Sequence, residues 1–157
     1  MRIGHGFDAH RLVPGRPLVL GGVRIAHERG LAGHSDGDAL LHAVASALLG
    51  ALGEGDLGRH FPSSDPSLEG IASREILARV AERVRAAGFA LGNLDATVVA
   101  EAPRLAGELA KMEGAIADVL GAPRERINVK ATSTDGLGAI GRGEGIAAFA
   151  VALLVPA

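Results

Sequence analysis

The last segment of the chain is the feature that most constrains its fold. Residues 146–155 read IAAFAVALLV, without a single polar side chain. Successive side chains of a β-strand point to opposite faces, so a strand here is apolar on both faces, and both must be covered. Two arrangements satisfy this requirement: the second face packs against other subunits, or the strand is central and buried within one domain.

The rest of the chain alternates between strand and helix patterns. Apolar spacing and end signals predict three helices, over residues 36–50, 73–87 and from Pro103 to Gly121. Runs of strand-forming residues predict strands over residues 1–12, 17–25, 94–100, 127–131 and 146–155. These elements predict an α/β (α+β) fold: a single domain over residues 1–157, a two-layer sandwich with helices on one face of a mixed sheet.

Composition narrows the classes of function. The chain has 48% apolar and 22% charged residues, which is typical of a globular protein. Its net charge of −2 gives no reason to expect nucleic acid or an acidic membrane as a partner. Cysteine is absent, which excludes thiolate metal sites and a Cys nucleophile. No basic segment followed by an apolar run begins the chain, so we expect a cytoplasmic protein.

Two short segments near the start carry a metal-ligand pattern. Asp8 and His10 are two residues apart, so in a strand they point to the same side. Ser35 or Asp36 is suited to cap a helix from about Gly37, and His42 then lies about one turn into it. If strand and helix meet, one carboxylate and two imidazoles converge. Three such ligands leave a position for water or substrate, unlike a closed structural zinc site.

A glycine-rich segment, residues 130–145, is the second chemical feature. Its glycines and the hydroxyls of residues 132–134 are suited to approach an anion, and Arg142 offers a planar fork to phosphate. Asp135 is suited to a hard cation such as Mg²⁺. The residue order of a Walker loop is absent. Taken alone, such a glycine-rich segment is more often a flexible turn.

The quoted segments, taken together, resemble one family. The similarity covers residues 1 to about 155, and the Ser-Asp-Gly-Asp-x-x-x-His run is its most specific part. The chain resembles the 2-C-methyl-D-erythritol 2,4-cyclodiphosphate synthase family. The segments that carry the resemblance are GFDAH (6–10), LGGVRI (20–25), HSDGDALLH (34–42), GDLG (55–58) with Phe61-Pro62, NVKAT (128–132) and GRGEGI (141–146).

The resemblance implies an activity in the non-mevalonate route to isoprenoids. Members of the family convert 4-diphosphocytidyl-2-C-methyl-D-erythritol 2-phosphate to the cyclic diphosphate and release CMP. The 2-phosphate of the substrate attacks the β-phosphorus of its own CDP group. The family's members are homotrimers with active sites between neighbouring subunits and sheets packed around a threefold axis, which agrees with a doubly apolar last strand.

The resemblance also implies roles for particular residues. It places Zn²⁺ on Asp8, His10 and His42, and Mg²⁺ or Mn²⁺ near Asp135, and it gives His34 and Ser133 a part in the transition state. Residues 56–58 and 61–65 would enclose the methylerythritol part, and residues 100–106 and 131–133 would form the cytidine pocket. The implied substrate-binding set is Asp8, Ala9, His10, His34, Ser35, Asp56, Leu57, Gly58, Phe61, Pro62, Ser63, Ser64, Asp65, Ala100, Glu101, Ala102, Pro103, Arg104, Leu105, Ala106, Ala131, Thr132, Ser133, Thr134, Asp135 and Arg142.

Two other classes of function stay open on the sequence. One is a metal-dependent phosphohydrolase, in which the same three ligands would activate water. The other is a non-catalytic trimer that binds isoprenoid diphosphates in an axial cavity. The products released from the cyclase substrate distinguish the first, and the effect of zinc loss distinguishes the second.

Overall fold

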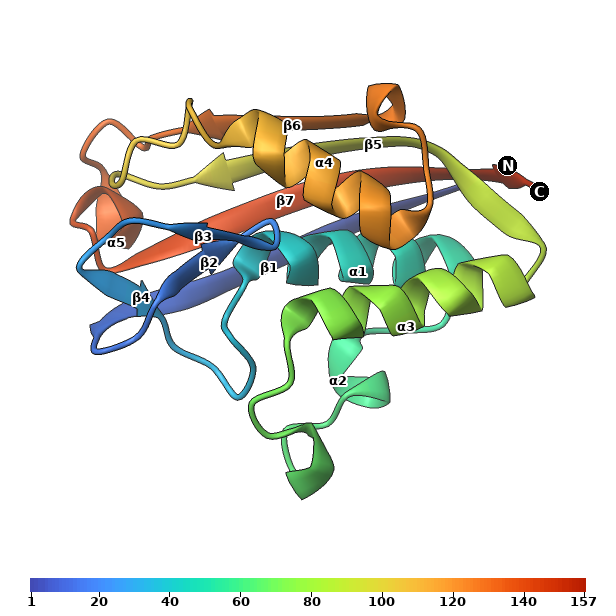
Figure 1. Ribbon diagram of the computed structural model, residues 1–157, viewed down its shortest axis with the longest axis horizontal. Coiled ribbons are helices and arrows are strands. Elements are labelled where there is room, and N and C mark those ends of the chain that lie inside the picture. The colour runs from blue at the N-terminus through green and yellow to red at the C-terminus, as the bar shows by residue number, and fades with distance from the viewer.

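A computed structural model describes all residues from Met1 to Ala157. Its main sheet has five strands in the order β4-β1-β7-β5-β6, and all neighbours are antiparallel except β5 and β6 (Figure 1). The strands are β1 (Arg2–Pro14), β4 (Arg29–Leu31), β5 (Phe89–Val99), β6 (Ile127–Thr132) and β7 (Gly145–Pro156), with a separate hairpin of β2 (Leu18–Leu20) and β3 (Val23–Ile25). The expected mixed sheet is confirmed.

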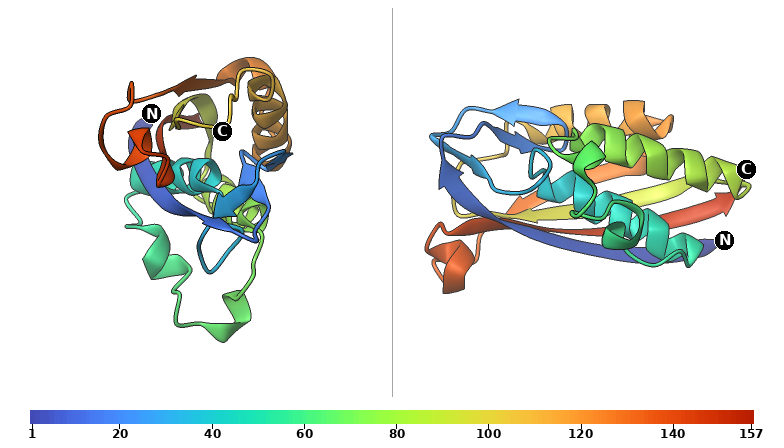
Figure 2. Two further views of the ribbon diagram at one scale, coloured as in Figure 1. Left: turned by 90° about the vertical axis from the view of Figure 1, so that its left-hand side faces the viewer. Right: turned by 90° about the horizontal axis from the view of Figure 1, so that it is seen from below.

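Three long helices form the second layer on one side of the sheet (Figure 2). They are α1 (Ala39–Leu52), α3 (Ser73–Ala86) and α4 (Leu109–Leu120). Helix α1 lies against β1 and β7, α4 lies against β6, and α3 packs on α1 and α4. One continuous core, which runs in sequence from Leu12 to Leu154, joins the two layers. No helix of the chain has the length and apolar character needed to cross a membrane.

Strand β7 shows why its sequence lacks polar residues. It is the middle strand of the sheet, between β1 and β5. Its inner face, including Ile146 and Leu154, is fully buried under α1. On the outer face, by contrast, Phe149 is 41% and Val151 is 40% exposed. One chain therefore covers one face of this strand and leaves the other open.

Several element boundaries differ from the sequence prediction. The third helix begins at Leu109, not at Pro103, because residues 101–108 form bends and turns. Gly107, a poor helix former, lies in this segment, and the side chain of Leu105 is buried although it is not part of a helix. The predicted strand over 17–25 is a hairpin that turns at Gly21 and Gly22, both with positive φ. Strand β5 begins five residues before Leu94, and a register shift near Gly92 joins its two parts.

The structure also contains short elements that the sequence did not predict. They are β4, α2 (Leu57–His60), the 3-10 turns η1 (Pro66–Leu68) and η2 (Arg124–Arg126), and α5 (Gly138–Gly141). Each is three or four residues long, too short to leave a periodic pattern.

Candidate metal centre

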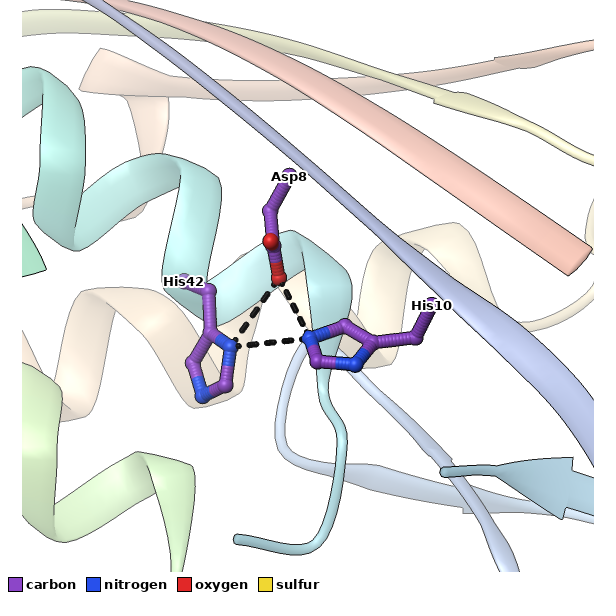
Figure 3. A group of neighbouring side chains, drawn as sticks. All are labelled: Asp8, His10 and His42. Carbon is purple, nitrogen blue, oxygen red and sulfur yellow. Dashed lines mark hydrogen bonds and ion pairs between the residues drawn. The ribbon is translucent and has the colours of Figure 1, made fainter. Parts of the chain in front are cut away.

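Three side chains from β1 and α1 converge at one point (Figure 3). Asp8 Oδ2 lies 2.7 Å from His10 Nε2 and 3.0 Å from His42 Nδ1, and the two nitrogens are 3.3 Å apart. Ligand atoms from all three residues lie within 4.8 Å of one another. The predicted constellation is therefore formed within one chain, and each residue presents one oxygen or nitrogen lone pair to the same space.

The start of α1 fixes His42 in this position. Asp38 caps the helix, because its carboxylate accepts a hydrogen bond of 3.0 Å from the Leu41 N–H. The same carboxylate accepts from the N–H groups of Gly21, at 2.9 Å, and Gly22, at 2.7 Å. The cap is thus Asp38 and not Ser35 or Asp36 as expected, since only Asp38 also satisfies the turn of the β2–β3 hairpin.

Strand β1 lies unusually close to α1, and its glycines explain why. A Cβ added at Gly6 would lie 1.9 Å from the Ala43 carbonyl oxygen, and one at Gly4 would lie 1.9 Å from that of Ala47. Only glycine permits this approach. Gly6 therefore helps to bring His42 within reach of Asp8.

The charges at the centre are strongly coupled. Burial by itself would raise the pKa of Asp8, but hydrogen bonds and charge interactions with His10 and His42 outweigh it and lower the pKa to about 2. The hydrogen bond to Asp8 raises the pKa of His10, although burial opposes the rise. Asp8 is consequently an anionic ligand at neutral pH. A proton on His10 competes with any metal for the same nitrogen.

Asp38 shows the opposite balance. Burial raises the pKa of its carboxyl to about 6, and the three backbone N–H bonds described above only partly offset this effect. Its hydrogen bonds hold the hairpin and the helix together, and its charge adds to the rise in the pKa of His10.

A cavity of about 190 Å³ opens beside the metal centre. Its lining includes the metal ligand His42 and eight residues that the resemblance assigns to the substrate: His10, His34, Ser35, Leu57, Phe61, Pro62, Ser63 and Asp65. Leu68, Glu69, Ile71 and Ile76 line it too and were missed, because a turn and the start of α3 carry no chemical motif. Asp56, Gly58 and Ser64 lie in the same loop but outside the lining; Asp56 caps α2 by accepting from the Arg59 N–H.

A second cavity, of about 270 Å³, lies at the ends of β5 and β6. Its lining is Ala100, Glu101, Pro103, Arg104, Leu105, Ala106, Ala131, Thr132 and Ser133. Every one of these residues belongs to the set predicted for cytidine binding, and Ala102 lies in the same segment. No residue lines both cavities, so a single chain does not bring Ser133 into the cavity of His34.

The glycine-rich segment also stays apart from the metal centre. Asp135 adopts the left-handed conformation, with a φ of 54°, and its N–H donates to Ser133 Oγ at 3.2 Å. Arg142 pairs with Glu144 at 2.9 Å, and 63% of the Arg142 side chain is exposed. Thr134, Asp135 and Arg142 line neither cavity.

Comparison with known proteins agrees with this geometry. The chain matches the model of the YgbB family over residues 1–155. It belongs to the YgbB family. It is 56% identical to the 2-C-methyl-D-erythritol 2,4-cyclodiphosphate synthase of Thiobacillus denitrificans, over 98% of this chain and 96% of the relative. It is 58% identical to that of Geotalea daltonii, over 98% and 90% of the two chains. The resemblance inferred from the sequence is thereby confirmed.

Solved structures share the fold. The bifunctional IspDF of Campylobacter jejuni superposes with a TM-score of 0.95 at 42% identity; the match covers 99% of this chain but only 42% of that longer protein. A CDP-bound form of 2C-methyl-D-erythritol-2,4-cyclodiphosphate synthase superposes with a TM-score of 0.90 at 36% identity, over 98% of this chain and all of the other. These two solved structures therefore have the same mixed sheet and helical layer as this chain.

Proposed function

We propose that this chain converts 4-diphosphocytidyl-2-C-methyl-D-erythritol 2-phosphate to 2-C-methyl-D-erythritol 2,4-cyclodiphosphate and releases CMP. The observation that carries the proposal is the open set of three ligands, Asp8, His10 and His42, beside a cavity in a member of this family. In the reaction an oxygen of the 2-phosphate bonds to the β-phosphorus. The bond from that phosphorus to the bridging oxygen breaks, and CMP leaves with that oxygen.

The donor set fits a catalytic zinc ion. Two imidazole nitrogens and one carboxylate oxygen are ligands that zinc accepts, and three protein ligands leave a position for substrate. A bound zinc ion would neutralise phosphate charge and draw the two phosphate groups together. The protein's part is to hold its three ligands in place and to keep Asp8 ionised, which its lowered pKa ensures.

The residues around the cavity would position the substrate. Leu57 and Phe61 pack against the core and present an apolar wall to the methylerythritol carbon chain. His34, which is exposed and lines the cavity, would hydrogen-bond a phosphate oxygen of the bound diphosphate. Phosphoryl transfer depends mainly on position and charge neutralisation, and these contacts supply position.

We assign the second cavity to the cytidine part. Its lining contains two backbone segments at the ends of neighbouring parallel strands, whose N–H and C=O groups are suited to read a base edge. The CDP-bound state of a solved relative supports a cytidine diphosphate-linked substrate. Ser133 would hydrogen-bond the phosphates, Asp135 would hold Mg²⁺ or Mn²⁺ bound with the diphosphate, and Arg142 would neutralise phosphate charge.

We propose a homotrimer as the working form. The outer sheet face exposes Ile3 (70%), Phe7 (52%), Phe149 and Val151 on adjacent strands, and the rings of Phe7 and Phe149 are 4.9 Å apart. Such an apolar patch marks an interface. Packing of three such faces around an axis would cover β7, and it allows the nucleotide cavity of one subunit to complete the metal cavity of the next.

A product assay tests the activity. Purified protein is given the proposed substrate with Zn²⁺ and Mg²⁺, with and without a chelator, and the products are separated by chromatography. We expect CMP and the cyclic diphosphate in equal amounts, and neither after chelation. A linear phosphate product would indicate a phosphohydrolase, and binding of isoprenoid diphosphates without turnover would indicate a non-catalytic trimer; either result overturns the proposal.

A further inference from the structure

The ring nitrogen of His42 that faces away from the ligands has partners of its own. His42 Nδ1 points toward Asp8 and His10, and Nε2 points away from them (Figure 3). Nε2 lies 2.8 Å from Ser73 Oγ and 3.2 Å from Ser35 Oγ. Ser73 is the first residue of α3, is fully buried and comes from a part of the chain that the metal motif does not include.

The carboxylate of Asp36 completes this network. Ser73 Oγ makes a short hydrogen bond to Asp36 Oδ1, and the Ser73 N–H donates to Oδ2 at 3.2 Å. An ionised carboxylate only accepts, so the Ser73 hydroxyl must donate its proton to Asp36. When a metal occupies Nδ1, the oxygen of Ser73 is left to accept from His42 Nε2–H. Asp36 fixes the direction of the Ser73 bond. Without a metal, Asp8 likewise accepts from His42 Nδ1–H, and Ser73 Oγ also lies 3.3 Å from Ser35 Oγ.

We propose that Ser73 and Asp36 are positioning residues that fix the tautomer of His42. The proton is held on Nε2 by the chain His42 to Ser73 to Asp36, so the lone pair of Nδ1 is directed at the metal position. Partners of this kind orient a ligating imidazole and raise its basicity. The inference rests on the proposed metal centre and adds to it two residues outside the three ligands.

His10 is held in a different way, which makes the role of Ser73 specific to His42. His10 Nδ1 lies 2.6 Å from the carbonyl oxygen of Ala32, so the backbone fixes this ring. Its partner cannot be removed by substitution of a side chain. The partner of His42 can, because it is a hydroxyl.

If Ser73 and Asp36 had a purely structural role, they would stabilise the start of α3 and would not affect His42. The N-cap residue of α3, Ala72, has no side chain for capping, and Asp36 replaces it by accepting from the Ser73 N–H. On that view the hydroxyl of Ser73 is incidental. Ser73→Ala separates the two roles, because it keeps the N–H that Asp36 caps and removes only the link to His42.

The test measures the dissociation constant for zinc by competition with a chelator. We expect Ser73→Ala to weaken zinc binding about 10- to 100-fold, and Asp36→Asn to weaken it less because the amide oxygen still accepts. Ser46→Ala is the matched control, since Ser46 lies one turn after His42 on the same helix and is half-buried. We expect this control to change zinc binding less than about twofold.

A second measurement does not depend on any variant. Nitrogen-15 NMR of the zinc-loaded parent identifies which ring nitrogen of His42 carries the proton, and we expect Nε2. A proton on Nδ1, or equal zinc affinities for Ser73→Ala and Ser46→Ala, would overturn the inference. If His42→Ala keeps its zinc, the metal centre itself is wrong; if that variant loses zinc while Ser73→Ala does not, only the positioning role fails.

Discussion

The metal centre and the glycine-rich segment are both rich in groups that bind phosphate or metal, but they are built differently. The ligands of the centre come from β1 and α1, and both imidazoles are tied by hydrogen bonds on their far side. Residues of the segment, such as Ser133 and Asp135, are exposed, and Leu137 is 73% exposed. One chain completes the first site and leaves the second open. On the proposed function, the substrate and a neighbouring copy would complete the open site.

Loss of one ligand should have the largest effect and should be confined to the metal centre. We expect the zinc content of His42→Ala to fall from about one ion per chain to roughly none, because the two remaining ligands hold zinc weakly. CMP release should fall with it. Elemental analysis after dialysis measures the zinc, and circular dichroism checks the fold. Unchanged zinc content in this variant would contradict the assignment of the centre.

A charge on the outer sheet face should disrupt the assembly proposed to complete the glycine-rich site, and it should leave the metal centre unchanged. We expect Val151→Asp to give a monomer, because burial of three carboxylates near one axis costs several kcal/mol. Zinc content should stay at the parent's level while CMP release is lost. Light scattering measures the assembly, and Val151→Ile, which keeps the face apolar, should remain a trimer. A parent protein that is monomeric at micromolar concentration would refute the assembly.

Features that follow from local sequence patterns could be predicted, and features that depend on contacts between distant segments could not. Asp8 and His10 follow from the two-residue repeat of a strand, and His42 follows from its place in the first turn of a helix. These are local periodicities. The true cap, Asp38, was missed because its two further hydrogen bonds come from the β2–β3 turn. Glu69 was missed as a lining residue for a similar reason, since only tertiary packing brings it to the cavity.

The family resemblance supplied what local patterns could not. It grouped the nine residues of the second cavity, which the structure confirms as neighbours, although no periodicity connects residues 100–106 with residues 131–133. It did not correct the start of α4, because Pro103 is an acceptable first residue of a helix, whereas in the structure residues 101–108 form bends and turns. How Asp135 and Arg142 act stays a prediction, because neither residue lines the metal cavity or the second cavity.

Arg142 tests whether the exposed segment binds phosphate at all. If it does, Arg142→Lys keeps the charge but loses the planar fork, and the loss of about 1.5–3 kcal/mol lowers turnover roughly 10- to 100-fold. Its present partner is an exposed pair with Glu144, which contributes little to stability. The melting temperature should therefore stay unchanged. Turnover within about twofold of the parent, for this variant and for Arg142→Ala, would mean that the segment is only a turn.

The smallest expected effect is the pH dependence of zinc binding at the metal centre. Zinc needs an unprotonated imidazole, and the bond to Asp8 raises the pKa of His10 above its ordinary value. As pH falls through that pKa, the zinc dissociation constant should rise about tenfold per unit, while above it the constant should level off. Asp8, with a pKa of about 2, stays ionised across this range and contributes no slope. Competition with a chelator of known proton affinity measures the constant. A flat curve from about pH 8 to 6 would show that His10 does not bind the metal through Nε2.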